Sequence, residues 1–454
     1  MPLNPVVTWF ERFLLRLSRL HPDHFRIARA AFWVGLFTIS AKLIAAGKEI
    51  AVAWRYGRGA EVDAYNLALT LSTWLPMTLV SVMTVVLVPV LAGRSAGQSQ
   101  HRQFLSELNG IALWCALGIM AIVTVFGVWA VSWYGHGLPA ATLEMTRNML
   151  YSFIPLSALM LFVGVHMVRM QACHDHSYAL AEGLPALAII LLLWAWQTID
   201  SLPLVAGTLL GTALQAIWLA RRAHGHDGSV GMSIKLQSTE WSMLWRSGLV
   251  MGIGQFAISL TTPIDQYFAA GLGTGAIATL GYANRLISIG MALGASIISR
   301  ATLPIFSEAV AKGQLAHISH LSIRWTCFVI IAGAALAGSC YLATPWLVKV
   351  VLQRGAFDTQ DTMVVANVIR HGIWQWPLYF GSLVLIQYAV AAKRYRLVAI
   401  SGGIAVLIKI LANTAMTPIF GVGGIVLGSV AMYMATLCWF IWCSTRYIGQ
   451  NDFK

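Results

Sequence analysis

Long apolar runs recur along the chain from residue 31 almost to its end, and few charges interrupt them. Of the 454 residues, 58% are hydrophobic and only 10% are charged. Soluble domains carry about 25% charged residues, so water is a poor solvent for most of this chain. A helix needs about 20 mostly apolar residues to cross a bilayer, and the runs have that length. We therefore expect an all-α, polytopic membrane protein without a separate soluble domain.

The apolar runs divide into about twelve membrane-crossing helices. Trp and Tyr cluster at many of their ends, because amphipathic rings favour the interface between membrane and water. An even number of spans places both chain ends on the same side of the membrane. The predicted spans lie near residues 31–53, 64–92, 108–133, 148–169, 178–197, 202–220, 243–270, 276–304, 321–350, 362–391, 397–417 and 423–445.

The placement of the cations predicts the orientation of these spans. The chain has 30 Lys and Arg residues against 17 Asp and Glu residues, a formal net charge of +13. With the N-terminus inside, 19 of the 30 cations fall on the cytoplasmic side and 5 on the outer side. Cytoplasmic loops of membrane proteins carry such an excess. Both termini are therefore expected in the cytoplasm, and no nucleic-acid partner is needed to explain the charge.

A sequence repeat divides the chain near its centre. Gly57-Arg-Gly-Ala60 recurs as Gly273-Thr-Gly-Ala276, an offset of about 216 residues. Six spans separate the copies, which predicts two six-helix lobes related by a pseudo-two-fold axis along the membrane normal. Chance similarity between Gly-rich loops is the alternative. The expected segments are a basic amphipathic N-terminal segment (1–30), a first lobe (31–222), a cytoplasmic linker (223–242), a second lobe (243–447) and a C-terminal tail (448–454).

The N-terminal segment is not typical of a cleavable signal peptide. Residues 1–30 carry five arginines and lack a continuous apolar core. Their apolar face suits a short helix that lies on anionic membrane lipids. A flexible basic tail that only sets the topology is the alternative.

Six cations remain inside the predicted spans after the topology has been assigned. An Arg or Lys at the centre of a membrane helix costs about 2.5–3.5 kcal/mol on insertion scales, so it usually faces a cavity, an ionic partner or a ligand. Arg300 lies close enough to a span end to reach the interface. A cavity rich in cations favours an anionic substrate, and phosphate or diphosphate groups fit best. The six residues are Lys42, Lys48, Arg285, Arg300, Arg370 and Lys409.

Acidic residues in or near the spans are fewer. Glu49 lies seven residues after Lys42 on nearly the same helical face. Asp63 stands at the start of the second span, where a carboxylate would cap the helix. Asp265 and Glu182 lie within spans seven and five. For each acid, a structural role and a role in the site both remain open.

No enzyme chemistry is indicated. The chain has neither a Walker A loop nor a Gly-x-Ser-x-Gly motif, and Gly-x-Gly at 57–59 and 273–275 follows helices rather than strands. His174-Asp-His176 has no third ligand nearby in the sequence. We therefore expect a non-enzymatic protein without catalytic residues, metal or cofactor.

Three motifs follow one another along the chain: Lys42-x5-Lys48-Glu49 with Tyr56-Gly57 and Asp63-Ala-Tyr65; Tyr282-Ala-Asn-Arg285-Leu286 leading to Leu303-Pro304; and Leu352-Gln-Arg-Gly-Ala-Phe357. In this order, from about Ile39 to Ile400, the chain resembles the MurJ/MviN family of lipid II flippases, within the superfamily of multidrug, oligosaccharidyl-lipid and polysaccharide exporters. The resemblance implies alternating access by two six-helix lobes around a cationic central cavity. The diphosphate of an undecaprenyl-linked glycan would bind there.

The resemblance also implies which residues bind the substrate. Lys42 and Lys48 stand where the family has arginines in its first span. Asp63 and Arg285 match the family's aspartate before span two and its arginine of span eight. The full set of candidate substrate-binding residues is Lys42, Lys48, Glu49, Asp63, Arg285 and Arg370.

The chain departs from the family pattern in several places. Lysine at positions 42 and 48 lacks the bidentate fork of arginine. The family's arginine in span two has no counterpart, since Trp74-Leu75-Pro76 occupies that stretch. Glu49 replaces a usual aspartate, Asn284 replaces a common acid, and the sequence ends after span twelve where the family typically adds two helices. A lipid-linked exopolysaccharide or other envelope glycan unit is therefore as strong a candidate substrate as lipid II.

Three functions compete on the sequence alone. The first is a flippase for a polyprenyl-diphosphate-linked saccharide in the bacterial cytoplasmic (inner) membrane. The others are an ion-coupled exporter of small drugs, which a basic cavity disfavours for cationic drugs, and a non-transporting scaffold of a glycan-synthesis complex. Without an ATP site, an ion gradient or the membrane potential would drive transport. Expected partners are the undecaprenyl-diphosphate-linked glycan and membrane lipids, with a coupling cation and glycan-synthesis proteins as further candidates.

Overall fold

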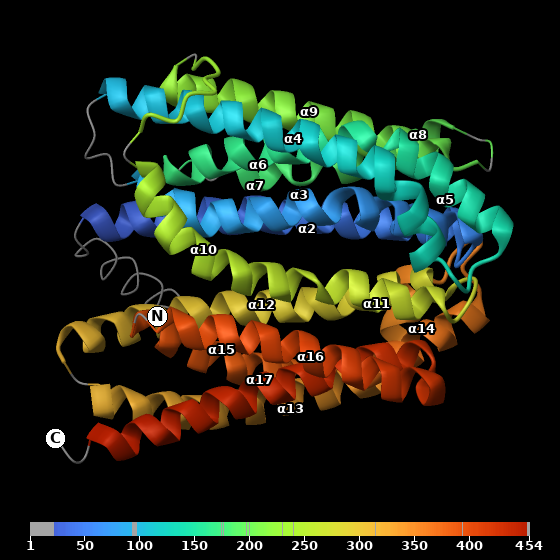
Figure 1. The fold of residues 1–454 in the computed structure, drawn as a ribbon. Helices are drawn as coiled ribbons and strands as arrows, with labels where there is room; N and C mark the ends of the chain where they lie inside the picture. The colour runs from blue at the N-terminus through green and yellow to red at the C-terminus, as the bar shows by residue number, and fades with distance from the viewer. Residues whose placement is uncertain are drawn as a thin grey trace, which may run out of the picture.

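The computed structural model describes residues 22–92, 98–173, 175, 177–196, 198, 200–228, 230–238, 240–313, 315–392 and 394–451. Figure 1 shows long helices aligned in one bundle, with their ends gathered at two opposite faces. Nine helices of this described part are long and apolar enough to cross a membrane. The prediction of an all-α polytopic membrane protein is confirmed.

Helices from the two halves of the chain lie in different parts of the bundle. In Figure 1 the first half, blue to green, lies above the second half, yellow to red. The first half comprises α2 (Pro22–Tyr56), α3 (Ala60–Ala92), α4 (Gln98–Tyr134), α5 (Ala140–Ser152), α6 (Ile154–Ala172), α7 (Tyr178–Ala181), α8 (Leu184–Ala195) and α9 (Leu202–Asp227). The second half comprises α10 (Glu240–Ser259), α11 (Thr261–Ala270), α12 (Ala276–Ala311), α13 (Leu315–Leu352), α14 (Thr359–Gly372), α15 (Gln375–Ala391), α16 (Tyr395–Phe420) and α17 (Val422–Asn451).

Four predicted spans are broken rather than continuous, as the pairs α5–α6, α7–α8, α10–α11 and α14–α15. In each pair a proline stands in the first turn of the second helix: Pro155, Pro185, Pro263 and Pro377. Proline lacks the N–H that would bond to the preceding turn, and it disfavours α geometry in the residue before it. Counted as single crossings, these pairs would restore twelve spans, and that count stays a prediction.

The helices at the two chain ends are longer than the predicted spans. α2 begins at Pro22, before the predicted start at 31, and α17 continues to Asn451, through most of the predicted tail. Figure 1 shows the start of α2 and the end of α17 at the same face of the bundle, as an even number of crossings requires. Residues 1–21, which hold most of the predicted N-terminal amphipathic helix, lie outside the described residues.

The main hydrophobic core runs through both halves of the bundle. Tyr65 packs edge-on against Phe153 in the first half, with ring centroids 6.0 Å apart. Tyr282 packs in the same way against Phe357 in the second half, at 5.6 Å. All four side chains are buried, and they lie near the face that carries the loops after α2, α4, α11 and α13. The sequence assigns these loops to the outside of the membrane, and we call this the outer face.

Candidate functional site

A small network of ion pairs joins the two halves of the protein. The Oε1 atom of Glu49 lies 2.7 Å from Nζ of Lys48 and 3.1 Å from Nε of Arg285. Lys48 and Glu49 belong to α2, whereas Arg285 belongs to α12. The side chains of Lys48 and Glu49 are 11% and 17% exposed, and that of Arg285 is 55% exposed. One carboxylate is therefore held by two cations, and the cation from the second half stays accessible.

This network has the chemistry of an anion site that a carboxylate already fills. Hydrogen bonds between ionised groups are about twice as strong as neutral ones, and phosphate oxygens accept them as carboxylate oxygens do. The sequence predicted Lys48, Glu49 and Arg285 as substrate contacts, and the structure brings these three side chains together.

Lys42 lies apart from this network, on the same helix. It precedes Glu49 by seven residues, or about 10 Å along the helix axis. Its side chain is exposed, and its charge lies near enough to Glu182, which follows α7, for the two groups to interact. Lys42 therefore stands closer to the N-terminal end of α2 than the Glu49 network does.

Asp63 is completely buried, with 0% of its surface exposed. Its carboxylate accepts hydrogen bonds from the backbone N–H groups of Gly275 and, at 2.7 Å, Ala278. These bonds cap the N-terminus of α12, where the helix dipole favours a negative charge. The sequence placed this cap on Asp63's own helix, α3, and the hydrogen bonds correct that expectation. A substrate contact through Asp63 stays a prediction and requires this capping contact to open.

Arg370 lies on α14 and contacts α13. Its Nε donates to the backbone carbonyl of Tyr341 at 3.3 Å, and its guanidinium carbon lies 5.1 Å from the centroid of the Tyr341 ring. Cation–π contacts of this kind hold the side chain against the ring. Arg370 is half-buried, and it has no ion pair with Glu49 among the described residues. Its role in substrate binding stays a prediction.

The outer face carries further contacts between the two halves, which the sequence analysis did not identify as a site. Nε of Arg58 lies 2.6 Å from Oδ1 of Asp361, and the Tyr282 hydroxyl donates to the Gly57 carbonyl at 2.8 Å. The Ala356 N–H donates to the Trp54 carbonyl at 2.8 Å. Together with the bonds of Asp63, these contacts hold the outer ends of the halves together, and we call them the outer closure. The recurring Gly-x-Gly-Ala loops were its sequence signal.

Lys409 is a buried partner of Asp265 rather than a cavity residue. Its side chain is 1% exposed, and Nζ lies 2.8 Å from Oδ1 of Asp265. The same ammonium donates to the Ile425 carbonyl at 3.1 Å and to the Ser429 hydroxyl at 2.5 Å. Asn413 also donates to Asp265, at 3.0 Å. The mid-span position of Lys409 is therefore explained by an internal ion pair of α11 and α16.

A second ionic cluster lies at the opposite end of the bundle from the outer closure. The Asp175 carboxylate accepts hydrogen bonds from Ser177 and lies 3.1 Å from Arg222 and 2.8 Å from His226. Burial raises the pKa of this carboxyl, but the His226 and Ser177 hydrogen bonds and the Arg222 charge together hold it well below its usual value. His174 and His176 lie outside the described residues, and no metal-binding group of three ligands occurs among those described.

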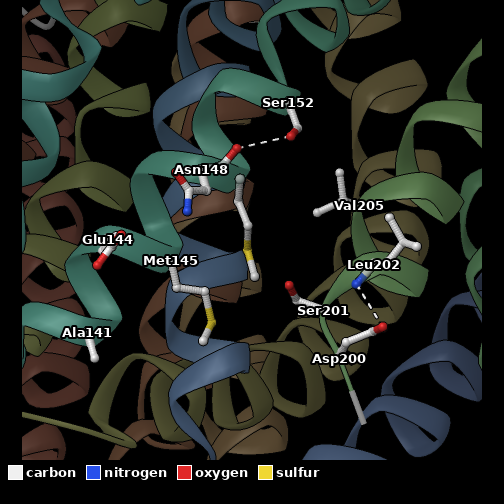
Figure 2. A pocket seen from close by; sticks show the side chains of 10 residues that line it. Ala141, Glu144, Met145, Asn148, Ser152, Asp200, Ser201, Leu202 and Val205 are labelled. Atoms are coloured by element: carbon white, nitrogen blue, oxygen red, sulfur yellow. Dashed lines mark hydrogen bonds between the residues drawn. The ribbon is translucent and has the colours of Figure 1, made fainter. Parts of the chain in front are cut away.

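A pocket of about 470 Å³ with a mixed polar and apolar lining opens between α5 and the start of α9. Figure 2 shows Glu144, Asn148 and Ser152 on one wall and Asp200 and Ser201 on the other. The lining carries two carboxylates and no Lys or Arg. This pocket therefore does not offer an anion site, and none of the predicted substrate-binding residues lines it.

A bundle of whole and broken apolar helices, with an ionic network between its two halves, defines the class of the protein: a polytopic α-helical membrane protein. The sequence profile of the family described as "Lipid II flippase MurJ" matches residues 52–453. The chain belongs to this family of multi-pass membrane proteins.

Relatives of this chain carry the same family name, and solved structures share its fold. A probable lipid II flippase MurJ of Bdellovibrio bacteriovorus is 25% identical over 82% of this chain and 71% of its own length. The lipid II flippase MurJ of Burkholderia cenocepacia is 24% identical over 93% of this chain and 84% of its own. A lipid II flippase MurJ in an inward closed conformation shares the fold with a TM-score of 0.77, at 15% identity over 91% of this chain and 87% of that one. An inward-facing multidrug MATE transporter shares it with a TM-score of 0.71, at 14% identity over 90% and 94%.

Proposed function

We propose that this protein moves a polyprenyl-diphosphate-linked saccharide across the bacterial cytoplasmic membrane, and that the substrate is lipid II. The family match and the names of the relatives support lipid II. An exopolysaccharide or other envelope glycan unit, which the sequence alone left equal to lipid II, gains no support from these relatives.

The observation that carries the proposal is the position of Glu49 between Lys48 and Arg285. In the proposed mechanism, the substrate diphosphate takes the place of the Glu49 carboxylate on these two cations. The substrate then replaces an internal contact between α2 and α12. Binding is thereby coupled to the relative position of the halves, because a ligand shifts a conformational equilibrium only through different contacts in the two states.

The remaining predicted residues have distinct places in this mechanism. Lys42 would meet the diphosphate before it reaches Lys48, since Lys42 lies nearer the end of α2 that the sequence assigns to the cytoplasm. Arg370 would contact the saccharide or the diphosphate after a rearrangement of α13 and α14. Asp63 would act by opening and reforming the outer closure. The energy source we propose is an ion gradient or the membrane potential, with a coupling cation as a further partner.

The two alternative functions predict different ligands. A small-drug exporter has support only from the shared fold of the MATE structures, and cationic drugs would be repelled by Lys48 and Arg285. A scaffold for glycan-synthesis proteins needs no ion pair that links two halves of a membrane bundle. The flippase proposal accounts for both the ionic network and the family.

The proposal is tested with the full chain reconstituted in vesicles that contain a fluorescent polyprenyl-diphosphate-linked disaccharide. A membrane-impermeant reagent reports how fast the saccharide appears on the other leaflet. We expect Lys48→Ala and Arg285→Ala each to slow this movement about tenfold or more, equivalent to about 1.4 kcal/mol of lost stabilisation. Arg285→Lys keeps the positive charge and loses only the bidentate geometry of the guanidinium group. Its rate should therefore fall between that of the wild type and that of Arg285→Ala.

The matched control is Lys349→Ala, which removes an exposed cation of α13 outside the network. Its rate should equal that of the wild type. Unchanged movement in both Lys48→Ala and Arg285→Ala would refute the site. No movement by the wild-type protein would favour the scaffold, and transport of cationic dyes without lipid movement would favour the drug exporter.

A further inference from the structure

An apolar groove of about 500 Å³ lies between α3 and α4 of the first half and α10 of the second. Its lining side chains are hydrocarbon or sulfur, apart from the hydroxyl of Thr78 and the indole N–H of Trp241, and include Leu79, Val86 and Ile111. Ile253 and Phe256 complete the α10 wall, and both are substantially exposed. A transporter surface in hydrocarbon gains little from burying such a groove against itself, so a hydrocarbon chain is its natural occupant.

Helices α3 and α10 contact each other directly at the groove. The Trp74 indole N–H donates to the Ser259 carbonyl at 3.0 Å, and the Trp74 and Phe256 rings lie 5.7 Å apart. Lower down, Gly252 packs against Val82. These contacts hold α3 of the first half against α10 of the second half along the groove. Because Leu79, Ile253 and Phe256 of its lining are exposed, an occupant can enter the groove from the surrounding bilayer.

The dimensions of the groove match one leaflet of a bilayer. Its wall on α3 runs from Thr78 to Leu87, or about 14 Å at 1.5 Å per residue. Half of a hydrocarbon core of about 30 Å is about 15 Å. A single acyl chain that hangs from the interface would therefore fill the groove along its length.

The end of the groove away from the outer face has the features of a headgroup interface. Trp241 lines it and donates its indole N–H to Oε2 of Glu107 at 2.6 Å. The linker before α10 is fixed there, since the Ser233 N–H donates to the Ser106 carbonyl at 2.9 Å. Lys235 on this linker is exposed. Tryptophan and lysine at this depth suit a phosphate headgroup.

We propose that this groove binds an anionic phospholipid of the cytoplasmic leaflet, with one acyl chain between α3, α4 and α10 and the phosphate near Lys235. Because its walls come from both halves, the bound lipid stabilises the arrangement in which α3 and α10 are packed together. The proposal concerns a resident lipid and does not depend on which substrate is transported.

The test places the full chain in nanodiscs of phosphatidylethanolamine with a trace of phosphatidylglycerol that carries a photoactivatable acyl chain. After illumination, mass spectrometry maps the labelled peptides. We expect label to concentrate on α3, α4 and α10, and unlabelled phosphatidylglycerol to compete at least fivefold better than phosphatidylcholine. Leu79→Trp fills the groove from its exposed side, and Ala112→Phe fills it from within, so each should lower this labelling at least fivefold.

The control is Val125→Trp, which adds the same ring to a lipid-exposed position of α4 outside the groove and should leave the labelling unchanged. Label spread evenly over the lipid-facing helices would overturn the proposal in favour of bulk lipid contact. Stronger labelling of the groove by a photoactivatable polyprenyl diphosphate would overturn it in favour of the substrate tail. Crosslinks between two chains at this surface would overturn it in favour of a protein contact.

Discussion

At the scale of single residues, Lys409 and Lys48 show two uses of a cation inside a membrane bundle. Lys409 is 1% exposed and has carboxylate, carbonyl and hydroxyl partners, so its charge is fully compensated within the second half. Lys48 shares its carboxylate with an arginine that is 55% exposed and that comes from the other half. The first arrangement stabilises the fold, whereas the second can exchange its anion for a ligand.

This distinction predicts that Lys409→Met destabilises the protein through its partner. Removing one member of a buried ion pair costs about 3–5 kcal/mol, because the remaining charge is left uncompensated. Thermal unfolding in detergent should show a large loss for Lys409→Met and recovery of most of it in Lys409→Met with Asp265→Asn. The exposed Lys349→Met should change stability by no more than about 0.5 kcal/mol. Equal stability of the single and double variants would contradict the pairing.

A second residue-scale prediction concerns Asp175 and pH. Its folded-state pKa is held below the ordinary value, so its ionised form is favoured by folding. This stabilisation is complete above the ordinary carboxyl pKa of about 4 and is lost as the pH falls through the lower folded-state pKa. Asp175→Asn should therefore unfold at a lower temperature than the wild type at pH 7. The difference should shrink in unfolding scans below about pH 4, and a difference independent of pH would contradict the assignment.

At the scale of helices, the start of α12 depends on a residue of the other half. The N-cap residue of α12 is Gly275, which has no side chain that could cap the helix. The carboxylate of Asp63, on α3, caps the helix instead. A loss of such a cap costs about 0.5–2 kcal/mol. The outer closure is thus partly a helix cap shared between halves, which links the local stability of α12 to their contact.

Asp63→Ala should therefore loosen the outer closure without unfolding the protein. Spin labels on the exposed positions Arg147 and Lys349 report the separation of the outer ends. We expect their distance distribution to broaden towards longer values in Asp63→Ala. Glu61→Ala removes another acid from the same first turn of α3, and it should leave the distribution unchanged. Identical distributions in wild type and Asp63→Ala would show that the cap does not hold the halves together.

Helix class and the approximate positions of the apolar helices could be predicted from the sequence, because apolar length is a local signal. Mid-span charge and the family resemblance singled out Lys48, Glu49 and Arg285 as candidates, but only the structure shows that the three lie together. The breaks within the spans could not be predicted from the sequence. Pro155 and Pro377 follow breaks, yet Pro304 and Pro345 lie inside continuous helices. Whether the chain breaks at a proline depends on packing that a single sequence does not reveal. The partners of Asp63 and the acidic partner of Lys409 were missed because they lie more than 140 residues away in the sequence.

At the scale of the whole molecule, outer loops of each half contact outer loops of the other half. The loop after α2 meets the loop after α13, where Gly57 packs on Ala356 and Gly355 packs on Trp54. The loop after α4 meets the end of α11, where Gly137 packs on Ala270 and Gly271. The first outer loop of each half thus contacts the second outer loop of the other half. Gly57, Gly137 and Gly355 stand where backbone of one half meets backbone of the other, and backbone can approach backbone this closely only where a side chain is missing.

The closure predicts that a side chain at Gly137 pushes the halves apart. A Cβ atom there would lie 2.6 Å from the Ala270 oxygen and 2.7 Å from the Gly271 Cα, distances that backbone atoms cannot accommodate without moving. Gly137→Val should therefore lengthen the distance between labels on Arg147 and Lys349. It should also slow saccharide movement about tenfold, or about 1.4 kcal/mol, because the closed outer state is no longer reached. Gly118→Val is the matched control, since no atom lies within 4 Å of its Cβ position. If Gly137→Val keeps the wild-type distances and rate, the outer closure is not a state through which transport passes.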